Sequence, residues 1–218
     1  MKKIPLKILL VLICVIILLV GNVLIYSNIA KKVTTGTPIV FSKIETPALL
    51  VIDVQESTTG EVASNESLIN QSDSLITNIN KLIRTCDTTN IPVIFITNEI
   101  TNPLINFLDN SSARGSAGPE VDKRLTVGDH PHYYKRKLDA FSNSDFEDYL
   151  LEHKINTLYI TGLDAKYCIS STVLGALNRE YKVNLLTNVI ISAEPTQCDS
   201  IFTSLSKNGA EIIPTLPF

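Results

Sequence analysis

Apolar runs of strand length alternate with helix-patterned segments over most of this chain, and this alternation limits the fold more than any other feature. The runs ALLVID (48–53), VIFIT (93–97), TLYITG (157–162) and VNLLT (183–187) are almost continuously apolar. Such runs are typical of strands buried on both faces of a parallel sheet. Between the first two, residues 68–83 carry apolar side chains at helical spacing, which predicts a helix that packs on the sheet.

The remaining segments complete the predicted fold. Two shorter runs, 132–135 and 211–215, bring the strands to six, and further helices are predicted at 144–154, 168–179 and 196–207. Strands that alternate with helices imply right-handed βαβ units. We therefore predict an α/β fold with a doubly wound, mostly parallel, Rossmann-like sheet in the order 3-2-1-4-5-6. Ligands of such sheets bind beyond the carboxyl ends of the strands, here between the first and fourth strands.

The N-terminus differs in character from the rest of the chain. Residues 8–26 are apolar except for Gly21 and Asn22, and about 20 such residues span the roughly 30 Å core of a bilayer. Lysines at positions 2, 3 and 7, with the terminal amine, outnumber Lys31 and Lys32 on the other side. The positive-inside rule then predicts a single-pass transmembrane helix with the following domain outside the cytoplasm. A cleavable signal peptide is the alternative, although no clear A-x-A site follows the run.

The chain therefore divides into three predicted parts. Residues 1–26 form the anchor, 27–46 a polar tether and 47–218 one globular domain, in which 98–131 is expected to be a long irregular loop. The formal net charge of -3 argues against nucleic acid as a partner, because nucleic-acid binders usually carry a basic face. The expected partners are the membrane and a small-molecule substrate.

The cysteines do not indicate a disulfide framework. Cys14 lies in the apolar run, and the other three, Cys86, Cys168 and Cys198, make an odd set. A Cys86–Cys198 pair is one option, and at least one thiol is expected to stay free. The sequence does not decide whether that pair forms.

Three residues are candidates for chemistry at the predicted crevice. Cys168 follows the fourth strand near a helix N-terminus, where thiol pKa values are commonly lowered; its alternative is a small buried apolar side chain. Asp53 closes an apolar strand, where a carboxylate is costly to bury without a role; its alternative is a solvated strand end. Lys135 is the third, but spacing alone does not favour it over Lys137.

Three motifs in order resolve that choice through a family resemblance. ALLVIDVQ (48–55), KRKLDAF (135–141) and ITGLDAKYC (160–168) together resemble the isochorismatase-like cysteine hydrolase superfamily, over residues 47–215. RGSAGPEVD (114–122) is similar to the loop that precedes the lysine in that family. The resemblance implies a catalytic triad of Asp53, Lys135 and Cys168, since the family lysine stands six residues before the Phe of the A-F pair.

The resemblance also implies a mechanism. Lys135 and the helix N-terminus are expected to favour the Cys168 thiolate, while Asp53 accepts the thiol proton and passes it to the leaving amine. A thioester would form and be hydrolysed. A non-proline cis peptide is expected at Leu163–Asp164 or its neighbour, which would aim the backbone amides of Asp164 and Cys168 at an oxyanion.

Departures from the family pattern narrow the expected chemistry. Nicotinamidases of the superfamily carry a D-x-H…H metal site after the first strand, but ESTTGEVASN (56–65) contains no histidine. His130 and His132 lack an obvious third ligand, so we predict no zinc, no iron and no other cofactor. The family motif DxQ-x-x-F reads DVQEST here, so one aromatic wall of the pocket is expected to differ.

The predicted function follows from the retained cysteine. Isochorismatases that cleave a vinyl ether typically lack it, so Cys168 favours hydrolysis of a C–N bond in a small amide, carbamoyl or ureido substrate. A vinyl-ether hydrolase and a membrane-tethered, non-catalytic protein with the same fold are the alternatives. Family members commonly form dimers or tetramers, which makes a homo-oligomer a further expectation.

Overall fold

A parallel sheet of six strands forms the centre of the computed structural model, which describes residues 5–40 and 44–217. The strand order is β3-β2-β1-β4-β5-β6, and every neighbouring pair is parallel. The predicted α/β class and strand order are confirmed. The strands are β1 (Pro47–Ile52), β2 (Val93–Asn98), β3 (His132–Lys135), β4 (Thr157–Gly162), β5 (Lys182–Ile190) and β6 (Glu211–Ile213).

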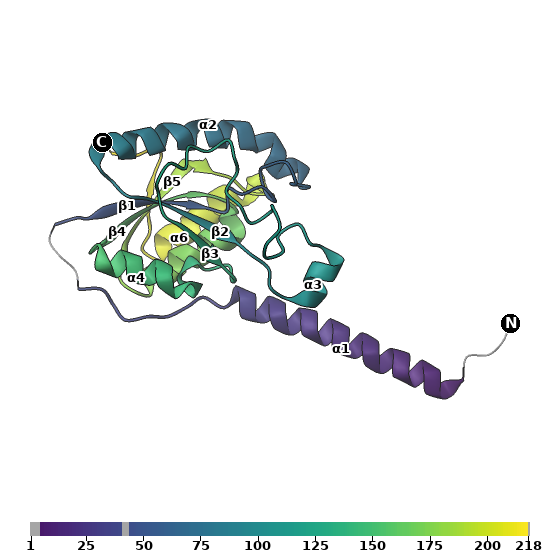
Figure 1. The fold of residues 1–218 in the computed structure, drawn as a ribbon. Coiled ribbons are helices and arrows are strands. Elements are labelled where there is room, and N and C mark those ends of the chain that lie inside the picture. Colours follow the sequence, from purple (N-terminus) through teal and green to yellow (C-terminus); the bar gives the residue numbers. More distant parts are fainter. Residues whose placement is uncertain (1–4, 41–43, 218) are drawn as a thin grey trace.

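Helices cover both faces of this sheet, as Figure 1 shows. The helix α2 (Glu66–Thr89) packs on one face, and α4 (Ser144–Glu152), α5 (Ser170–Leu177) and α6 (Cys198–Lys207) pack on the other. Successive strand residues point to opposite faces, so each central strand contributes apolar side chains to both cores. This two-sided burial explains why the strands read as continuous apolar runs.

The apolar N-terminal run forms the helix α1 (Leu6–Lys31), which extends away from the domain (Figure 1). None of its residues is buried. It is long and apolar enough to cross a membrane. A signal sequence near the N-terminus can have the same length and apolar character. The helix continues five residues past Tyr26, the end of the predicted anchor. Lys2 and Lys3, on which the predicted orientation depends, lie outside the described residues.

The tether after α1 is fastened to the domain. Thr34 donates two hydrogen bonds to Asp139 Oδ2, from its backbone N (2.8 Å) and from its hydroxyl (2.6 Å). Its carbonyl accepts from Asn178 Nδ2 (2.9 Å), and its hydroxyl oxygen accepts from Arg179 Nη1 (3.0 Å). Asp139 and Arg179 are both buried, so this part of the tether is held by interior groups.

The long segment between β2 and β3 contains a helix that the sequence analysis did not predict. This helix, α3 (Pro103–Leu108), lies beside α1 (Figure 1). Asn102 caps it by accepting from the backbone N of Leu104 (3.0 Å), and Pro103 occupies the first turn. A helix of six residues is too short to show a periodic pattern, but Asn followed by Pro is a helix-start signal. The prediction of an irregular loop was wrong at these residues.

Candidate active site

Asp53, Lys135 and Cys168 meet at the carboxyl ends of the central strands. Lys135 Nζ lies 3.0 Å from Asp53 Oδ2 and 3.1 Å from Cys168 Sγ, and it donates a third hydrogen bond to the Lys137 carbonyl at 3.2 Å. The three side chains are buried, and Lys135 is 0% exposed. Residues 115 positions apart in sequence, Asp53 and Cys168, are thus joined through one ammonium group. We call these three residues, the predicted catalytic triad, the catalytic cluster.

Asp53 is aimed by a sharp turn directly after β1. Its φ is 54°, in the left-handed region that Asp tolerates better than most residues. The backbone N donates to Ile96 O on β2 (2.8 Å), and the carbonyl accepts from the Thr58 hydroxyl (2.6 Å). Only one carboxylate oxygen is occupied: Oδ1 is buried and has no hydrogen-bond partner among the described residues. A buried unpaired acceptor is costly to the fold.

Lys135 ends the edge strand β3, where it pairs with Asn98 of β2. The neighbouring cations differ in environment: Arg136 is exposed and bonds Glu99, and Lys137 contributes its carbonyl, not its amine, to Lys135. Burial therefore distinguishes Lys135 from the two basic residues that follow it, which spacing in the sequence did not.

Cys168 lies on a π-helical turn, Ala165–Ile169, that leads into α5. The helical segment therefore begins three residues before the predicted start at Cys168. The Asp164 carboxylate holds the turn in place by accepting from Lys166 N (2.8 Å), Ser192 Oγ (2.9 Å) and Ala193 N (2.7 Å). The expected non-proline cis peptide is present at Leu163–Asp164. The oxyanion role of the Asp164 and Cys168 backbone amides stays a prediction.

Burial changes the electrostatics that the sequence suggested. Burial raises the pKa of the Cys168 thiol, the Asp53 carboxylate raises it further, and the Lys135 ammonium lowers it only in part. Burial lowers the pKa of Lys135, but Asp53 and Cys168 more than offset this, so its net pKa is raised. The net pKa of the Cys168 thiol is therefore raised, against the expectation of a low pKa, because burial and the Asp53 carboxylate outweigh the Lys135 ammonium.

Comparison with known proteins identifies the family. Residues 47–215 match the isochorismatase domain. The chain belongs to the isochorismatase family. A nicotinamidase from Escherichia coli (strain K12) is 32% identical over 96 residues, which cover 43% of this chain and 41% of that enzyme.

Solved structures of family relatives share the fold. N-carbamoylsarcosine amidase from Thermoplasma acidophilum superposes with a TM-score of 0.65 at 23% identity, covering 77% of this chain and 95% of that one. A pyrazinamidase of Pyrococcus horikoshii, solved in complex with zinc, gives a TM-score of 0.66 at 18% identity, covering 78% and 99%. The N-terminal 46 residues of this chain precede the matched isochorismatase domain.

The residues that the structure describes do not form a candidate metal site. Among residues 5–40 and 44–217, no three His, Cys, Asp or Glu side chains gather closely enough to hold an ion. His130 pairs with Asp87 (3.0 Å), and His132 shares a hydrogen bond with Thr97 (2.7 Å). Both histidines thus have local partners that need no metal. The absence of a cofactor stays a prediction.

Gln55 is a positioning residue that the sequence analysis did not select. Its amide nitrogen donates to Ser57 Oγ (2.8 Å), Asn98 O (3.1 Å) and Gly118 O (3.0 Å), and its amide oxygen accepts from Asn98 N (2.7 Å). These bonds tie the turn after Asp53 to β2 and to the long loop before β3. The signal was the glutamine of the family's DxQ motif, two positions after Asp53.

Thr58 occupies the position where the family motif has an aromatic residue. Its hydroxyl bonds back onto the turn, to Asp53 O (2.6 Å), and accepts from Gln55 N (3.2 Å). A short side chain that bonds its own backbone supplies no aromatic wall. The region beside Asp53 is therefore more polar than the family motif implies.

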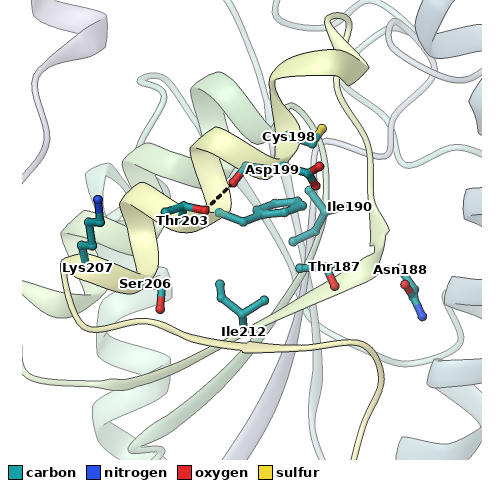
Figure 2. A pocket seen from close by; sticks show the side chains of 10 residues that line it. Thr187, Asn188, Ile190, Cys198, Asp199, Thr203, Ser206, Lys207 and Ile212 are labelled. Carbon is teal, nitrogen blue, oxygen red and sulfur yellow. Dashed lines mark hydrogen bonds between the residues drawn. The ribbon is translucent and has the colours of Figure 1, made fainter.

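A hollow of about 750 Å³ lies elsewhere, between α6 and the strands β5 and β6. Figure 2 shows Cys198, Asp199 and Lys207 around it. None of the catalytic cluster lines it. Cys198 and the buried Cys86 are both free thiols, so the optional disulfide does not form.

Proposed function

We propose that this chain is an amidohydrolase of the isochorismatase family that cleaves a C–N bond in a small amide, carbamoyl or ureido substrate. Cys168 is the nucleophile, Asp53 the acid and base, and Lys135 the cation that couples them. The observation that carries the proposal is the position of Lys135 Nζ, 3.0 Å from the Asp53 carboxylate and 3.1 Å from the Cys168 sulfur. A nucleophile and a base that are held by one hydrogen-bonded cation fit the general pattern of covalent catalysis.

Charge balance explains how a thiol with a raised pKa can attack. Neutral Cys168, cationic Lys135 and anionic Asp53 sum to zero, and proton transfer from Cys168 to Asp53 leaves that sum unchanged. Loss of the same proton to solvent would leave a net negative charge in a buried site, which is costly. The thiolate therefore forms by proton transfer within the cluster.

The chemical steps follow from this transfer. The thiolate attacks the substrate carbonyl carbon, and protonated Asp53 delivers its proton to the nitrogen as the C–N bond breaks. The amine or ammonia leaves and a Cys168 thioester remains. Asp53 then takes a proton from water as the resulting hydroxide attacks the thioester, and the released sulfur recovers that proton. Backbone amides of Asp164 and Cys168 are proposed to stabilise the oxyanion in both halves.

The free Asp53 Oδ1 and the bonded Thr58 indicate the substrate class. An unpartnered buried acceptor favours a substrate that offers an N–H donor, as an amide or ureido nitrogen does. Thr58 supplies no aromatic surface, which argues against a flat aromatic amide that would need stacking. N-carbamoylsarcosine amidase, among the relatives, is named for a non-aromatic carbamoyl compound.

Ammonia release by the purified full-length chain tests the activity. The panel contains aliphatic primary amides, N-carbamoyl amino acids and nicotinamide, and we expect turnover of at least one non-aromatic member. Cys168→Ala should abolish that turnover, whereas Cys198→Ala removes a thiol outside the catalytic cluster and should leave it intact. A thioester adduct on Cys168 should be trapped by acid quenching and detected by mass. Turnover that persists in Cys168→Ala would contradict the mechanism.

We also propose that residues 1–26 anchor the chain in a membrane, that 27–46 form the tether, and that 47–218 form a catalytic domain outside the cytoplasm. The length and apolar character of α1 support anchoring, and the excess of lysine before the run supports the orientation. A reporter fused after Phe218 should be active only outside the cytoplasm. Activity inside would contradict the orientation, and a soluble mature protein would contradict the anchor.

A further inference from the structure

The short helix α3 presents an apolar surface that no protein segment covers among the described residues. Phe107 is 85% exposed and Leu108 is 71% exposed. On its inner side, α3 contributes Leu104 and Leu108 to an apolar crevice of about 290 Å³ against α1. The α1 side of this crevice is lined by Leu19, Val20, Val23 and Leu24.

The part of α1 that α3 contacts belongs to the predicted membrane span. An α-helix rises 1.5 Å per residue, so Leu24 lies about 3 Å and Leu19 about 10 Å from Tyr26, where the apolar run ends. Interfacial helices typically bury their apolar faces about 5–10 Å into the boundary between headgroups and acyl chains. A segment packed against these residues therefore shares their depth.

Polar groups at this contact are matched to each other. Asn22, the one amide side chain within the apolar run, accepts a hydrogen bond from Asn102 Nδ2 at 3.0 Å. An unpaired amide in acyl chains is costly, and the bond from Asn102 lowers that cost by satisfying the Asn22 oxygen. Asn102 also caps α3, so one residue both starts the short helix and satisfies the polar position of α1.

We propose that α3 is a second membrane contact, in which Phe107 and Leu108 enter the leaflet that holds the C-terminal end of α1. The proposal rests on the anchor proposed above. The occupant of this surface is lipid, because the surface is continuous with α1, and α1 exposes large apolar side chains all round without a buried stripe for a protein partner. The polar residues Asn102 and Asp109 flank α3, and its one polar residue, Asn106, donates a hydrogen bond back to the Ile100 carbonyl (3.0 Å).

This contact brings the catalytic cluster close to the bilayer surface. The carbonyl of Ala30 accepts from Leu138 N at 3.0 Å, next to Lys137, whose carbonyl holds Lys135. Two points of attachment, α1 and α3, restrain the domain more than a single tether does.

Depth-dependent fluorescence quenching tests the proposal, since the chain contains no tryptophan. The full-length variants Phe107→Trp and Leu108→Trp are reconstituted into phosphatidylcholine vesicles that carry bromine either near the headgroups or near the chain ends. Ile17→Trp, in the middle of the apolar run, reports the anchor. Leu151→Trp, which replaces an exposed residue of α4 away from α3 (Figure 1), is the matched control.

We expect both α3 variants to lose fluorescence, more with bromine near the headgroups, and Ile17→Trp to lose more with bromine near the chain ends. Leu151→Trp should be unaffected. If Ile17→Trp is quenched while both α3 variants are not, the second contact is overturned and the anchor stands. Emission from the α3 variants that changes only with protein density identifies a second copy as the occupant, which also overturns the proposal. If no variant is quenched, both the proposed anchor and the second membrane contact are overturned. The ammonia assay tests the proposed hydrolase activity separately and is unaffected by that result.

Discussion

Two buried carboxylates, Asp53 and Asp122, sit in neighbouring loops of this protein and differ in one respect. Asp122 is 0% exposed and both its oxygens are occupied: Oδ1 accepts from Arg124 N and Nε, and Oδ2 accepts from Arg124 Nη2 and Thr59 Oγ1. Asp53 is 4% exposed, contacts Lys135 through Oδ2, and leaves Oδ1 without a partner among the described residues. Both oxygens of Asp122 therefore accept hydrogen bonds, whereas one oxygen of Asp53 accepts none from the described residues.

The difference separates a structural from a reactive role for the same side chain. A fully bonded carboxylate stabilises the loops that it joins, because each charged hydrogen bond contributes and no lone pair is stranded. A carboxylate with a free oxygen is costly to the fold and retains an acceptor for a substrate or a proton. Sites of catalysis are commonly arranged in the second way.

The largest expected effect is on activity. Asp53→Asn should lower kcat/KM by at least about 10³-fold, because a general acid and base typically contributes about 10²–10⁴-fold and the proton transfer from Cys168 is also lost. Asp122→Asn keeps the shape of its side chain and should change kcat/KM by less than about tenfold, or about 1.4 kcal/mol in barrier. Steady-state kinetics on the substrate found in the panel checks both. Equal losses of kcat/KM in the two variants would contradict the assignment of a reactive role to Asp53 and a structural role to Asp122.

The next largest effect is on stability. Asp122→Ala should lower the free energy of unfolding by about 2–3 kcal/mol, since it strands a guanidinium and a hydroxyl that bonded a charged acceptor. The double variant Asp53→Asn/Lys135→Met removes both charges of the buried pair and should cost less than about 1 kcal/mol, because such replacements are often neutral or stabilising. Denaturant unfolding of the full-length chain in detergent measures both. A larger cost for the double variant would show that the catalytic cluster stabilises the fold.

A smaller effect distinguishes the partners of Cys168 by the pH dependence of its alkylation. Asp53 raises the pKa of the thiol and Lys135 lowers it. Asp53→Asn should therefore move the reaction with iodoacetamide to lower pH, and Lys135→Met should move it to higher pH. A thiol pKa that falls by about one gives roughly ten times more thiolate at a pH below the pKa, which corresponds to about 1.4 kcal/mol. The double variant Cys14→Ala/Cys198→Ala provides a background that lacks the exposed and the half-buried thiol. Movement in the same direction for both variants would contradict the charge assignment.

The smallest effect concerns acid stability. Burial raises the pKa of Asp122, but its bonds from Arg124 and Thr59 outweigh burial, and the net pKa is lowered. A carboxyl with a lowered folded pKa stabilises the protein above its unfolded pKa, near 3.9, and this contribution is lost as the pH falls through the folded value. The unfolding free energy of Asp122→Asn should therefore depend less steeply on pH below about pH 5 than that of the wild type. If the two curves of unfolding free energy against pH are parallel, groups other than Asp122 cause the loss of stability in acid.

Local pattern predicted most of the fold and little of its electrostatics. The β4 segment matched its predicted bounds because an apolar run reports burial directly. The helix α3 was missed because a single turn carries no period. The pKa of Cys168 was misjudged because the helix terminus and Lys135 were visible in the motif, whereas burial and the Asp53 carboxylate act through space.

The sequence by itself determined the layered sheet and the apolar helix at the N-terminus. Through its motifs it also selected Asp53, Lys135 and Cys168 as the candidate catalytic residues. Only the tertiary structure decided that one ammonium joins the other two, that one oxygen of Asp53 stays free of the described residues, and that α3 lies against α1. The physical reason is the distance over which each effect acts. Backbone and burial preferences are set by neighbours along the chain, whereas desolvation and charge depend on every group that packs around a site.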